Sequence, residues 1–315
     1  MQDTPNSINS PNSLTSAFTG TFKSGFAALI GRPNAGKSTL LNRLLGTKVA
    51  IVSEKPQTTR NQVRGILDDS RMQAVLLDTP GVHKPRHKLD ERMMRAVTES
   101  INGCDVALFV VDVSEPYGKG EQYIAERLLN IKAPVLLLLN KIDLVEKSSL
   151  LPLLAAWSER FAATEQIPLS AVTGENCPLL LDMLYKYLPE GPRYYPQGTI
   201  SDQPEQMLLA ELVREQLLAC TEQEIPHAAA VTIAAMEERP DNRLYVEANI
   251  YVERESQKGI MIGKQGAMLK KIGTAARREM ERWLACPVYL ELRVKTKRDW
   301  RNNERLLRSW DMMEK

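Results

Sequence analysis

The feature of this sequence that most restricts its fold is the segment Gly31–Ser38, which reads GRPNAGKS and fits the pattern GxxxxGK[ST]. An apolar run that predicts a strand, Phe26–Ile30, precedes it, and a helical pattern, Lys37–Leu45, follows. In such a strand–loop–helix unit, loop N–H groups and the helix N-terminus converge on phosphate oxygens. Lys37 supplies a positive charge for the β- and γ-phosphates, and the Ser38 hydroxyl can ligate Mg²⁺. The segment therefore predicts a phosphate-binding loop.

Apolar runs alternate with helical patterns around this loop, as far as Leu188. The runs are apolar throughout, as strands covered on both faces are. They are Phe26–Ile30, Ala74–Asp78, Val106–Asp112, Val135–Asn140 and Ile167–Leu169. This order predicts βαβ units, and hence an α/β fold with a mostly parallel sheet.

Three further motifs follow in order, each at the carboxyl end of a predicted strand, where open α/β sheets bind their ligands. The first is DTPG, in which Asp78 can hold Mg²⁺ through water and the Gly81 N–H can meet a γ-phosphate. The second is NKID, formed by Asn140, Lys141 and Asp143 among its four residues. A carboxylate there can accept two hydrogen bonds from guanine, whereas adenine has the wrong donor pattern.

The third motif is the pair Ser170-Ala171, where a backbone N–H could reach the guanine O6. Together the motifs resemble those of the translation-factor-type small GTPases over about residues 25–188. The resemblance implies binding of GTP and GDP with Mg²⁺. It implies nucleotide contacts from these motif residues and from the loop residues Gly31, Asn34, Ala35, Gly36, Lys37, Ser38 and Thr39.

A switch threonine completes the site in that family, and the segment QTTR offers Thr58 and Thr59. We favour Thr59, which would ligate Mg²⁺ together with Ser38 and Asp78, and only when a γ-phosphate is present. A capping or turn threonine remains the alternative. Lys37, Thr59 and Gly81 are the expected catalytic residues.

One departure from the family bears on hydrolysis. Many relatives carry Gln after the DxxG glycine to orient the attacking water, but this chain has Val82, which has no polar group. We expect slow intrinsic hydrolysis and interpret the following His83 as a surface residue that points elsewhere. Some relatives that lack the Gln bind K⁺ through a loop asparagine, so Asn34 is the candidate for a K⁺ site.

The C-terminal part of the chain differs in composition. Residues 251–315 carry 16 Lys and Arg and 9 Asp and Glu, whereas the first 250 carry 25 and 30. This asymmetry suggests contact with a polyanion, although a solvated basic surface fits it equally well. A Pro-rich and Gly-rich linker, residues 189–204, precedes a predicted helix, two strands, a glycine loop, a helix, a strand and a last helix, about Arg298–Trp310.

The glycine loop is a GxxG sequence, Gly263-Lys264-Gln265-Gly266, followed on the predicted helix by Lys270 and Lys271. Its glycines let a nucleic-acid backbone approach, and its N–H groups and Lys264 can hold phosphates, as in a KH domain. The element order matches the type II KH arrangement. A packing loop with solvated lysines remains the alternative, and the basic strip Arg293–Arg301 fits either a phosphate contact or a solvated surface.

The complete pairing resembles the Era GTPases from about Gly25 to Trp310. It implies a polar tail (1–22), a GTPase domain (23–188), a linker (189–204) and an α+β type II KH domain (205–315). It also implies binding to small-subunit (16S) ribosomal RNA and the 30S subunit during maturation, not to DNA. Location would be cytoplasmic, with peripheral association at the inner membrane that no feature of the sequence explains.

Three other functions stay open from the sequence. They are an RNA-modification GTPase, a membrane-remodelling GTPase, and a binding module whose nucleotide site does not turn over. No run of the sequence is long and apolar enough to span a membrane. The four cysteines form no CxxC pair and read as thiols of a reducing compartment.

Overall fold

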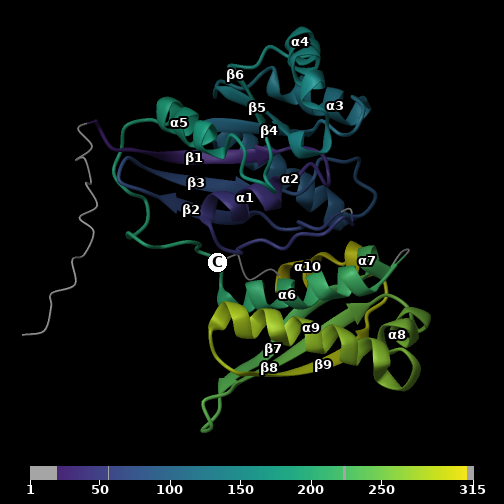
Figure 1. Ribbon diagram of the computed structural model, residues 1–315. Coiled ribbons are helices and arrows are strands. Elements are labelled where there is room, and N and C mark those ends of the chain that lie inside the picture. The colour runs from purple at the N-terminus through teal and green to yellow at the C-terminus, as the bar shows by residue number, and fades with distance from the viewer. Residues whose placement is uncertain (1–19, 56, 223–224, 311–315) are drawn as a thin grey trace, which may run out of the picture.

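The computed structural model describes residues 20–55, 57–222 and 225–310 of the 315-residue chain (Figure 1). Most of the predicted polar tail lies outside these ranges. The four cysteines are free thiols, as expected. No helix in the described ranges is long and apolar enough to cross a membrane.

The N-terminal part is built on a six-stranded sheet with the strand order β2-β3-β1-β4-β5-β6. Its elements are β1 (Lys23–Ile30), α1 (Lys37–Leu45), β2 (Val63–Asp68), β3 (Met72–Asp78), α2 (Lys88–Gly103), β4 (Val106–Asp112), α3 (Lys119–Leu128), β5 (Val135–Asn140), η1 (Ile142–Leu144), η2 (Lys147–Ser149), α4 (Leu150–Arg160), β6 (Glu165–Leu169) and α5 (Cys177–Tyr187). The pairing of β2 with β3 is antiparallel and the other pairings are parallel, so the prediction of a mostly parallel sheet is confirmed. The sequence did not reveal β2, whose apolar run is interrupted by Arg64 and Gly65.

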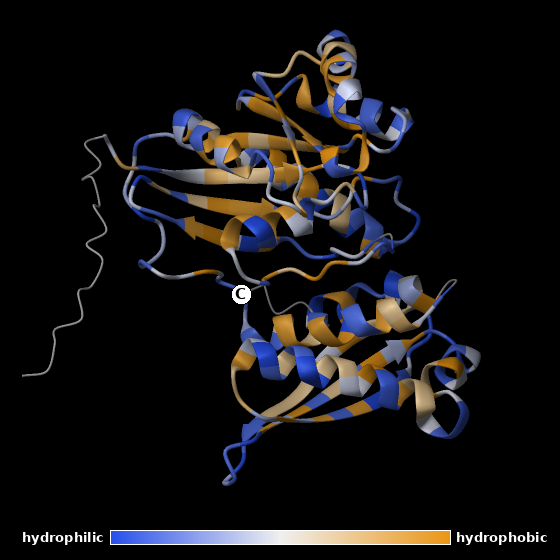
Figure 2. Ribbon diagram, viewed as in Figure 1, coloured by the Kyte–Doolittle hydropathy of each residue, from blue (hydrophilic) through white to orange (hydrophobic). Residues whose placement is uncertain are grey.

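Helices cover both faces of this sheet because its central strands are apolar on both sides. Alternate residues of β1 enter different cores: Ala28 and Ile30 pack on the side of α2, α3 and α4, whereas Ala27 and Leu29 pack on the side of α1 and α5. Figure 2 shows the central strands as largely hydrophobic ribbons between helices of mixed character. The carboxyl ends of the strands therefore meet at one open edge, where the loops gather.

The C-terminal part has a three-stranded sheet, β7-β8-β9, in which β7 is antiparallel and β9 parallel to β8. Its elements are α6 (Glu205–Cys220), α7 (Ile225–Ala228), β7 (Ala230–Glu238), β8 (Leu244–Val252), α8 (Glu255–Ile262), η3 (Lys264–Gly266), α9 (Ala267–Leu284), β9 (Val288–Thr296), η4 (Trp300–Asn302) and α10 (Glu304–Trp310). Helices α6 and α9 pack together on one face of the sheet (Figure 1).

Two expectations for this part were incomplete. Helix α8 was missed because its sequence, ESQKGIMI, contains Gly259 and has a weak helical pattern. Its start is stabilised by Gln257 Oε1, which accepts hydrogen bonds from the N–H groups of Glu253 and Arg254, both 3.0 Å. The single last helix predicted over Arg298–Trp310 is divided into η4 and α10, with Asn303 extended between them.

Candidate nucleotide site and nucleic-acid interface

A cavity of about 730 Å³ lies at the carboxyl edge of the six-stranded sheet. Its walls come from the phosphate-binding loop, from the segment between α1 and β2, and from the ends of β4 and β5. It is lined by residues 32–39, 51–54 and 57–59, together with Gly81, Asp112, Glu115, Glu121 and Lys141. The start of α1 borders this cavity, so the helix N-terminus contributes positive potential to it.

The loop before α1 needs glycine at position 36. Gly36 has φ +94°, and a Cβ there would collide with the Asn140 side-chain amide. That amide joins two loops, because Asn140 Nδ2 donates to the Ala35 carbonyl at 2.8 Å and Oδ1 accepts from the Ala171 N–H at 3.0 Å. The buried Asn140 therefore connects the phosphate-binding loop to the loop after β6.

Lys37 is buried inside this loop, with 5% of its surface exposed. Its Nζ donates to the backbone carbonyls of Gly31, at 3.2 Å, and Arg32, at 2.8 Å. Burial lowers the pKa of Lys37 to about 8, although the nearby Asp78 carboxylate opposes this shift. A buried ammonium group at this point is suited to bind anionic phosphate oxygens.

Three side-chain oxygens converge beside Lys37. Ser38 Oγ lies 2.6 Å from Asp78 Oδ2 and 2.9 Å from Thr59 Oγ1, and Thr59 Oγ1 lies 3.3 Å from Asp78 Oδ2. The other carboxylate oxygen, Asp78 Oδ1, is buried without a hydrogen-bond partner in the described residues. Burial raises the pKa of Asp78, and the charge of Lys37 works against this. Hydroxyl and carboxylate oxygens are the donors that Mg²⁺ prefers, so this set fits that ion.

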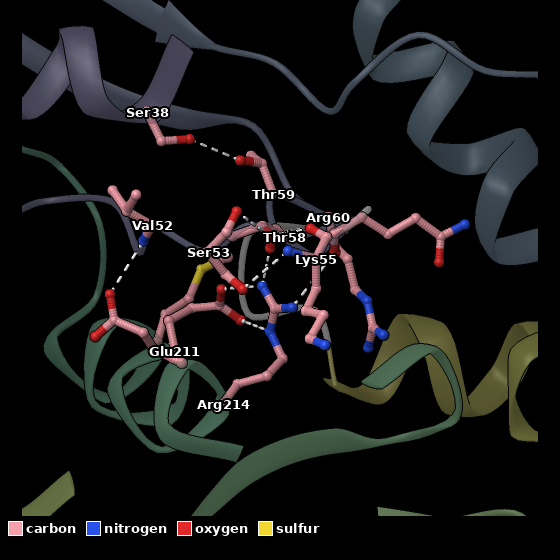
Figure 3. A network of polar contacts seen from close by, with 12 residues as sticks. Ser38, Val52, Ser53, Lys55, Thr58, Thr59, Arg60, Glu211 and Arg214 are labelled. Carbon is pink, nitrogen blue, oxygen red and sulfur yellow. Dashed lines mark hydrogen bonds and ion pairs between the residues drawn. The ribbon is translucent and has the colours of Figure 1, made fainter. Parts of the chain in front are cut away.

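The two candidate threonines have different environments. The Thr58 hydroxyl donates to the backbone carbonyls of Ser53 and Lys55, at 3.3 and 2.6 Å, and so stabilises the loop itself. The Thr59 hydroxyl instead meets Ser38 and Asp78, as Figure 3 shows for Ser38. This geometry favours Thr59 as the metal-facing residue.

The residues after DTPG lie away from the cavity. Val82 is buried in the core, and its N–H donates to the Gly31 carbonyl at 3.1 Å. The expectation that His83 is a surface residue was only partly right: it does not line the cavity, but its ring is mostly buried. Nδ1 lies 2.7 Å from the Gly81 carbonyl and Nε2 lies 3.3 Å from Asp90 Oδ1, so His83 connects the DTPG loop to α2.

Of the residues predicted to contact the base, Lys141 lines the cavity, whereas Asp143, Ser170 and Ala171 do not. Lys141 has φ +69° and forms a 2.5 Å ion pair with Asp112. Asp143, in η1, is exposed and does not line the cavity. Ser170 is buried and its Oγ accepts a hydrogen bond from the Thr173 N–H, so it shapes the loop that carries Ala171.

Asn34, the asparagine of the phosphate-binding loop, has a hydrogen-bond partner outside that loop. Asn34 has φ +65°, and its Nδ2 donates to the Glu54 carbonyl at 2.6 Å. The amide is thereby oriented across the mouth of the cavity, between the phosphate-binding loop and the segment before Thr59.

The GxxG sequence forms the turn between α8 and α9. Gly263 and Gly266 have φ values of +72° and +79°, and Gln265 also has a positive φ, +51°. Lys264 and Gln265 are exposed at its tip. Lys270 and Lys271 are exposed on the first turns of α9, and neither they nor Lys264 makes an ion pair with another described residue.

Beside this turn lies a groove of about 380 Å³ between α9 and β9, with walls that include Leu269, Leu290 and Leu292. Lys270, Thr274 and Arg277 also line this groove, so its wall is partly apolar and partly basic and can accept a base and its phosphate. The basic strip further along is partly neutralised, because Arg293 pairs with Glu247 at 3.1 Å and Arg301 with Glu253 at 2.5 Å.

Contacts between the two parts of the chain were not predicted. Arg60 donates to the carbonyls of Ala229, at 2.6 Å, and Pro226, at 3.0 Å, and its guanidinium lies 5.7 Å from the Trp300 ring. Burial lowers the pKa of Arg60 to about 9. A lone Arg after two threonines gives no sign of a partner about 170 residues away, so the sequence offered no signal for this contact.

Comparison with known proteins gives two family-model matches. The model described as 50S ribosome-binding GTPase matches residues 26–141, and the model described as KH domain matches residues 224–301. The chain is 49% identical over 292 residues to GTPase Era of Staphylococcus haemolyticus (strain JCSC1435). This match covers 93% of the present chain and 98% of that protein.

Two solved structures are similar over most of their length. One is a single-residue variant of Aquifex aeolicus Era bound to GDP.AlF4-, and the other is Era in complex with MgGDPNP and nucleotides 1506–1542 of 16S ribosomal RNA. Each is 39% identical with a TM-score of 0.89, and each match covers 92% of the present chain and 99% or 98% of the other.

Proposed function

Since the chain belongs to the Era family of GTPases, we propose that it is a GTP-hydrolysing switch that binds small-subunit ribosomal RNA during maturation of the 30S subunit. The observation that carries this proposal is the convergence of Ser38, Thr59 and Asp78 at one end of the phosphate-binding loop. In this proposal residues 23–188 are the GTPase domain, 189–204 the linker and 205–315 the KH domain.

The phosphates of GTP would lie against the N–H groups of the loop residues Gly31, Asn34, Ala35 and Gly36. Lys37 would contact the β- and γ-phosphates, and Thr39 lies in the first turn of α1. Ser38, Thr59 and Asp78 would hold Mg²⁺, which when bound neutralises charge on the phosphate oxygens. The Gly81 N–H would meet the γ-phosphate. Thr59 can reach the metal only with its segment closed over the cavity, so its contact would report the presence of GTP.

The base would lie at the rim, where Asp143 accepts hydrogen bonds from guanine and the Ala171 N–H approaches O6. Asn140, through its bonds to Ala35 and Ala171, would keep the base-binding and phosphate-binding loops in register. Lys141, held by Asp112, and Ser170 would shape the two loops around the base.

Hydrolysis is expected to be slow because Val82 is apolar and buried. Asn34, oriented by the Glu54 carbonyl, is the residue that would hold K⁺ beside the phosphates. Single-turnover hydrolysis in matched K⁺ and Na⁺ buffers tests this part: faster turnover in K⁺ that is lost in Asn34→Ala supports it, and equal rates in both salts refute it.

The RNA would bind at the GxxG turn and the adjacent groove. Lys264, Lys270 and Lys271 would contact phosphates, the turn of Gly263, Gln265 and Gly266 would let the backbone approach, and the groove of α9 and β9 would take the bases. We further propose a cytoplasmic location with peripheral association at the inner membrane, which rests on the family resemblance alone. No DNA target is proposed.

RNA crosslinking in cells, followed by sequencing, tests the proposed target. A carboxylate in the turn itself, as in Gly263→Asp, would repel phosphate but would also strain the turn, because a Cβ at Gly263 would lie 2.8 Å from Met268 Cβ. Lys264→Glu with Lys270→Glu repels phosphate and leaves the turn intact, and Lys147→Glu, on the exposed η2, is the matched control. Reads at the 3′ end of the small-subunit RNA that disappear in the double variant support the proposal. Reads that persist in it refute the RNA site.

A further inference from the structure

Helix α6 of the C-terminal part lies against residues 48–55 and 57–60, which belong to the segment that carries Thr59 to the nucleotide site (Figures 1 and 3). The packing is close, because the side chain of Ile51 belongs to the same buried core as Leu208 and Leu212 of α6. A segment that is expected to move with nucleotide state is therefore partly built into the core of the RNA-binding part.

Arg214 of α6 makes the contact nearest to the nucleotide site. Its Nη2 donates to the Thr58 carbonyl and its Nη1 to the Gln57 carbonyl, the latter at 3.4 Å. The side chain is 2% exposed, so these hydrogen bonds are shielded from water. Since the Thr58 carbonyl belongs to the peptide bond that leads into Thr59, fixing it fixes where the Thr59 side chain begins.

The guanidinium of Arg214 is itself oriented. Glu211, one turn earlier on α6, accepts from Arg214 Nε at 2.8 Å and from Nη2 at 2.5 Å. A carboxylate that engages the guanidinium through two nitrogens holds its plane in one orientation. The ion pair with Glu211 thus orients the Arg214 guanidinium toward the Gln57 and Thr58 carbonyls, as Figure 3 shows for Arg214 and Glu211.

The next residue of α6 holds the other end of the segment. Glu215 Oε1 accepts from the Val52 N–H at 3.0 Å, and Oε2 pairs with Lys48 Nζ at 2.5 Å. Two consecutive α6 residues therefore hold the segment at two places: Glu215 at Lys48 and Val52, and Arg214 at Gln57 and Thr58.

We propose that Arg214 is a positioning residue for GTP binding and hydrolysis: the RNA-binding domain supplies the group that holds Thr59 at the metal site. This inference rests on the proposed function, because it assigns Arg214 an effect through the metal-binding role of Thr59. Arg214 does not line the cavity, and its hydrogen bonds go to Glu211 and to the Gln57 and Thr58 carbonyls, so its effect must pass through the Thr58–Thr59 backbone.

The test compares full-length wild type with Arg214→Met, Thr59→Ala, the double variant, and Arg243→Met. Arg243→Met is the control, because it removes a guanidinium from the turn between β7 and β8, where Arg243 pairs with Asp241. The affinities for GDP and for the GTP analogue GDPNP are measured at fixed Mg²⁺, together with the single-turnover rate of GTP hydrolysis.

Arg214→Met should bind GDPNP about tenfold more weakly and hydrolyse GTP more slowly, with GDP affinity within about twofold of wild type. In the Thr59→Ala background the same substitution should add no further loss. If Arg214 had a merely structural role, its substitution would weaken the binding of GDP and GDPNP equally, or would still weaken GDPNP binding in the Thr59→Ala background. Either result overturns the inference. Wild-type affinities and hydrolysis rate in Arg214→Met also overturn it.

The same measurements distinguish failure of the proposed function from failure of the inference about Arg214. If Thr59→Ala leaves GDPNP affinity unchanged, the role of Thr59 is wrong and the inference falls with it. If Thr59→Ala is defective and Arg214→Met is normal, the inference alone is wrong. Should Arg214→Met fail to fold, Glu211→Gln decides the matter: a GDPNP-selective loss of about threefold supports the inference, and wild-type affinity overturns it.

Discussion

The Ser38 hydroxyl donates a 2.6 Å hydrogen bond to Asp78 Oδ2, although the two residues are 40 positions apart and lie on α1 and β3. The parallel pairing of β1 with β3 brings the start of α1 and the end of β3 to the same edge of the sheet. A hydroxyl and a carboxylate at this spacing can share one divalent cation.

Ser38→Ala should therefore abolish most of the benefit that Mg²⁺ gives to nucleotide binding. We expect GDP affinity in Mg²⁺ to fall at least about tenfold, while affinity in excess EDTA stays nearly equal to that of wild type. Thr98→Ala is the control, since its hydroxyl bonds the Met94 carbonyl within α2. An equal loss with and without Mg²⁺ would contradict a metal-binding role for Ser38.

Asn140→Ala should destabilise the protein as well as weaken nucleotide binding. The substitution leaves the buried Ala35 carbonyl and Ala171 N–H without the partner they have now, at a cost of about 1–3 kcal/mol for each group. Urea unfolding with and without GDP measures both effects. A variant as stable as wild type would show that these hydrogen bonds contribute little.

Asp143→Asn should separate base recognition from folding. Asp143 is exposed, so we expect the free energy of unfolding to change by less than about 0.5 kcal/mol. GTP affinity should fall by at least about a hundredfold, because an amide cannot accept both guanine donors. Xanthosine triphosphate, which presents an acceptor in place of the exocyclic amine, should bind better to the variant than to wild type. Unaltered GTP affinity would exclude Asp143 from the base site.

Nucleotide affinity should decrease as the pH rises through about 8, the pKa to which burial lowers Lys37. Below this pH Lys37 is charged in the free protein. Above it Lys37 is a neutral amine in the free protein, and this amine must take up a proton on binding because phosphates favour the charged form. Affinity should then fall by up to about tenfold per pH unit until the pKa of the complex is reached.

Titration of GDP at pH 7, 8 and 9 in buffers of different ionisation enthalpy measures both the affinity and the proton uptake. Lys37→Arg should bind more weakly at pH 7 but with little pH dependence, because arginine stays protonated throughout this range. A wild-type affinity that does not change up to pH 9 would show that Lys37 keeps an ordinary pKa.

Lys264→Ala should weaken RNA binding without altering GTP hydrolysis in the absence of RNA. Removing one phosphate contact should reduce the slope of log affinity against log salt by about 0.7 for single-stranded RNA. Lys147→Ala is the control on the GTPase domain and should leave the slope unchanged. An identical slope for Lys264→Ala and wild type would place the phosphate contacts elsewhere.

Much of the nucleotide site could be predicted from the sequence because its residues occur in short motifs. A loop such as Gly31–Ser38 has few conformations that satisfy its glycines and the following helix, so local sequence defines local geometry. The strand runs are equally local, since a stretch such as Val135–Asn140 is apolar on both faces and can only be a buried strand or helix segment.

Other features depended on residues far apart in sequence. The sequence favoured Thr59 over Thr58 only by its position before Arg60. The contacts of the two hydroxyls, with the loop backbone for Thr58 and with Ser38 and Asp78 for Thr59, come from the tertiary structure. The sequence also could not reveal that His83 packs against Asp90, or that β2 joins the edge of the sheet.

The sequence by itself therefore determined which chemical groups this protein carries: a phosphate-binding loop, a carboxylate at Asp143 that we predict to read guanine, and a basic GxxG turn. Only the tertiary structure decided how these parts are connected. Arg214 and Thr58 lie 156 positions apart, and no local pattern encodes their contact. It arises because Leu208 and Leu212 of α6 share a buried core with Ile51, and that packing brings a guanidinium to a backbone carbonyl beside Thr59.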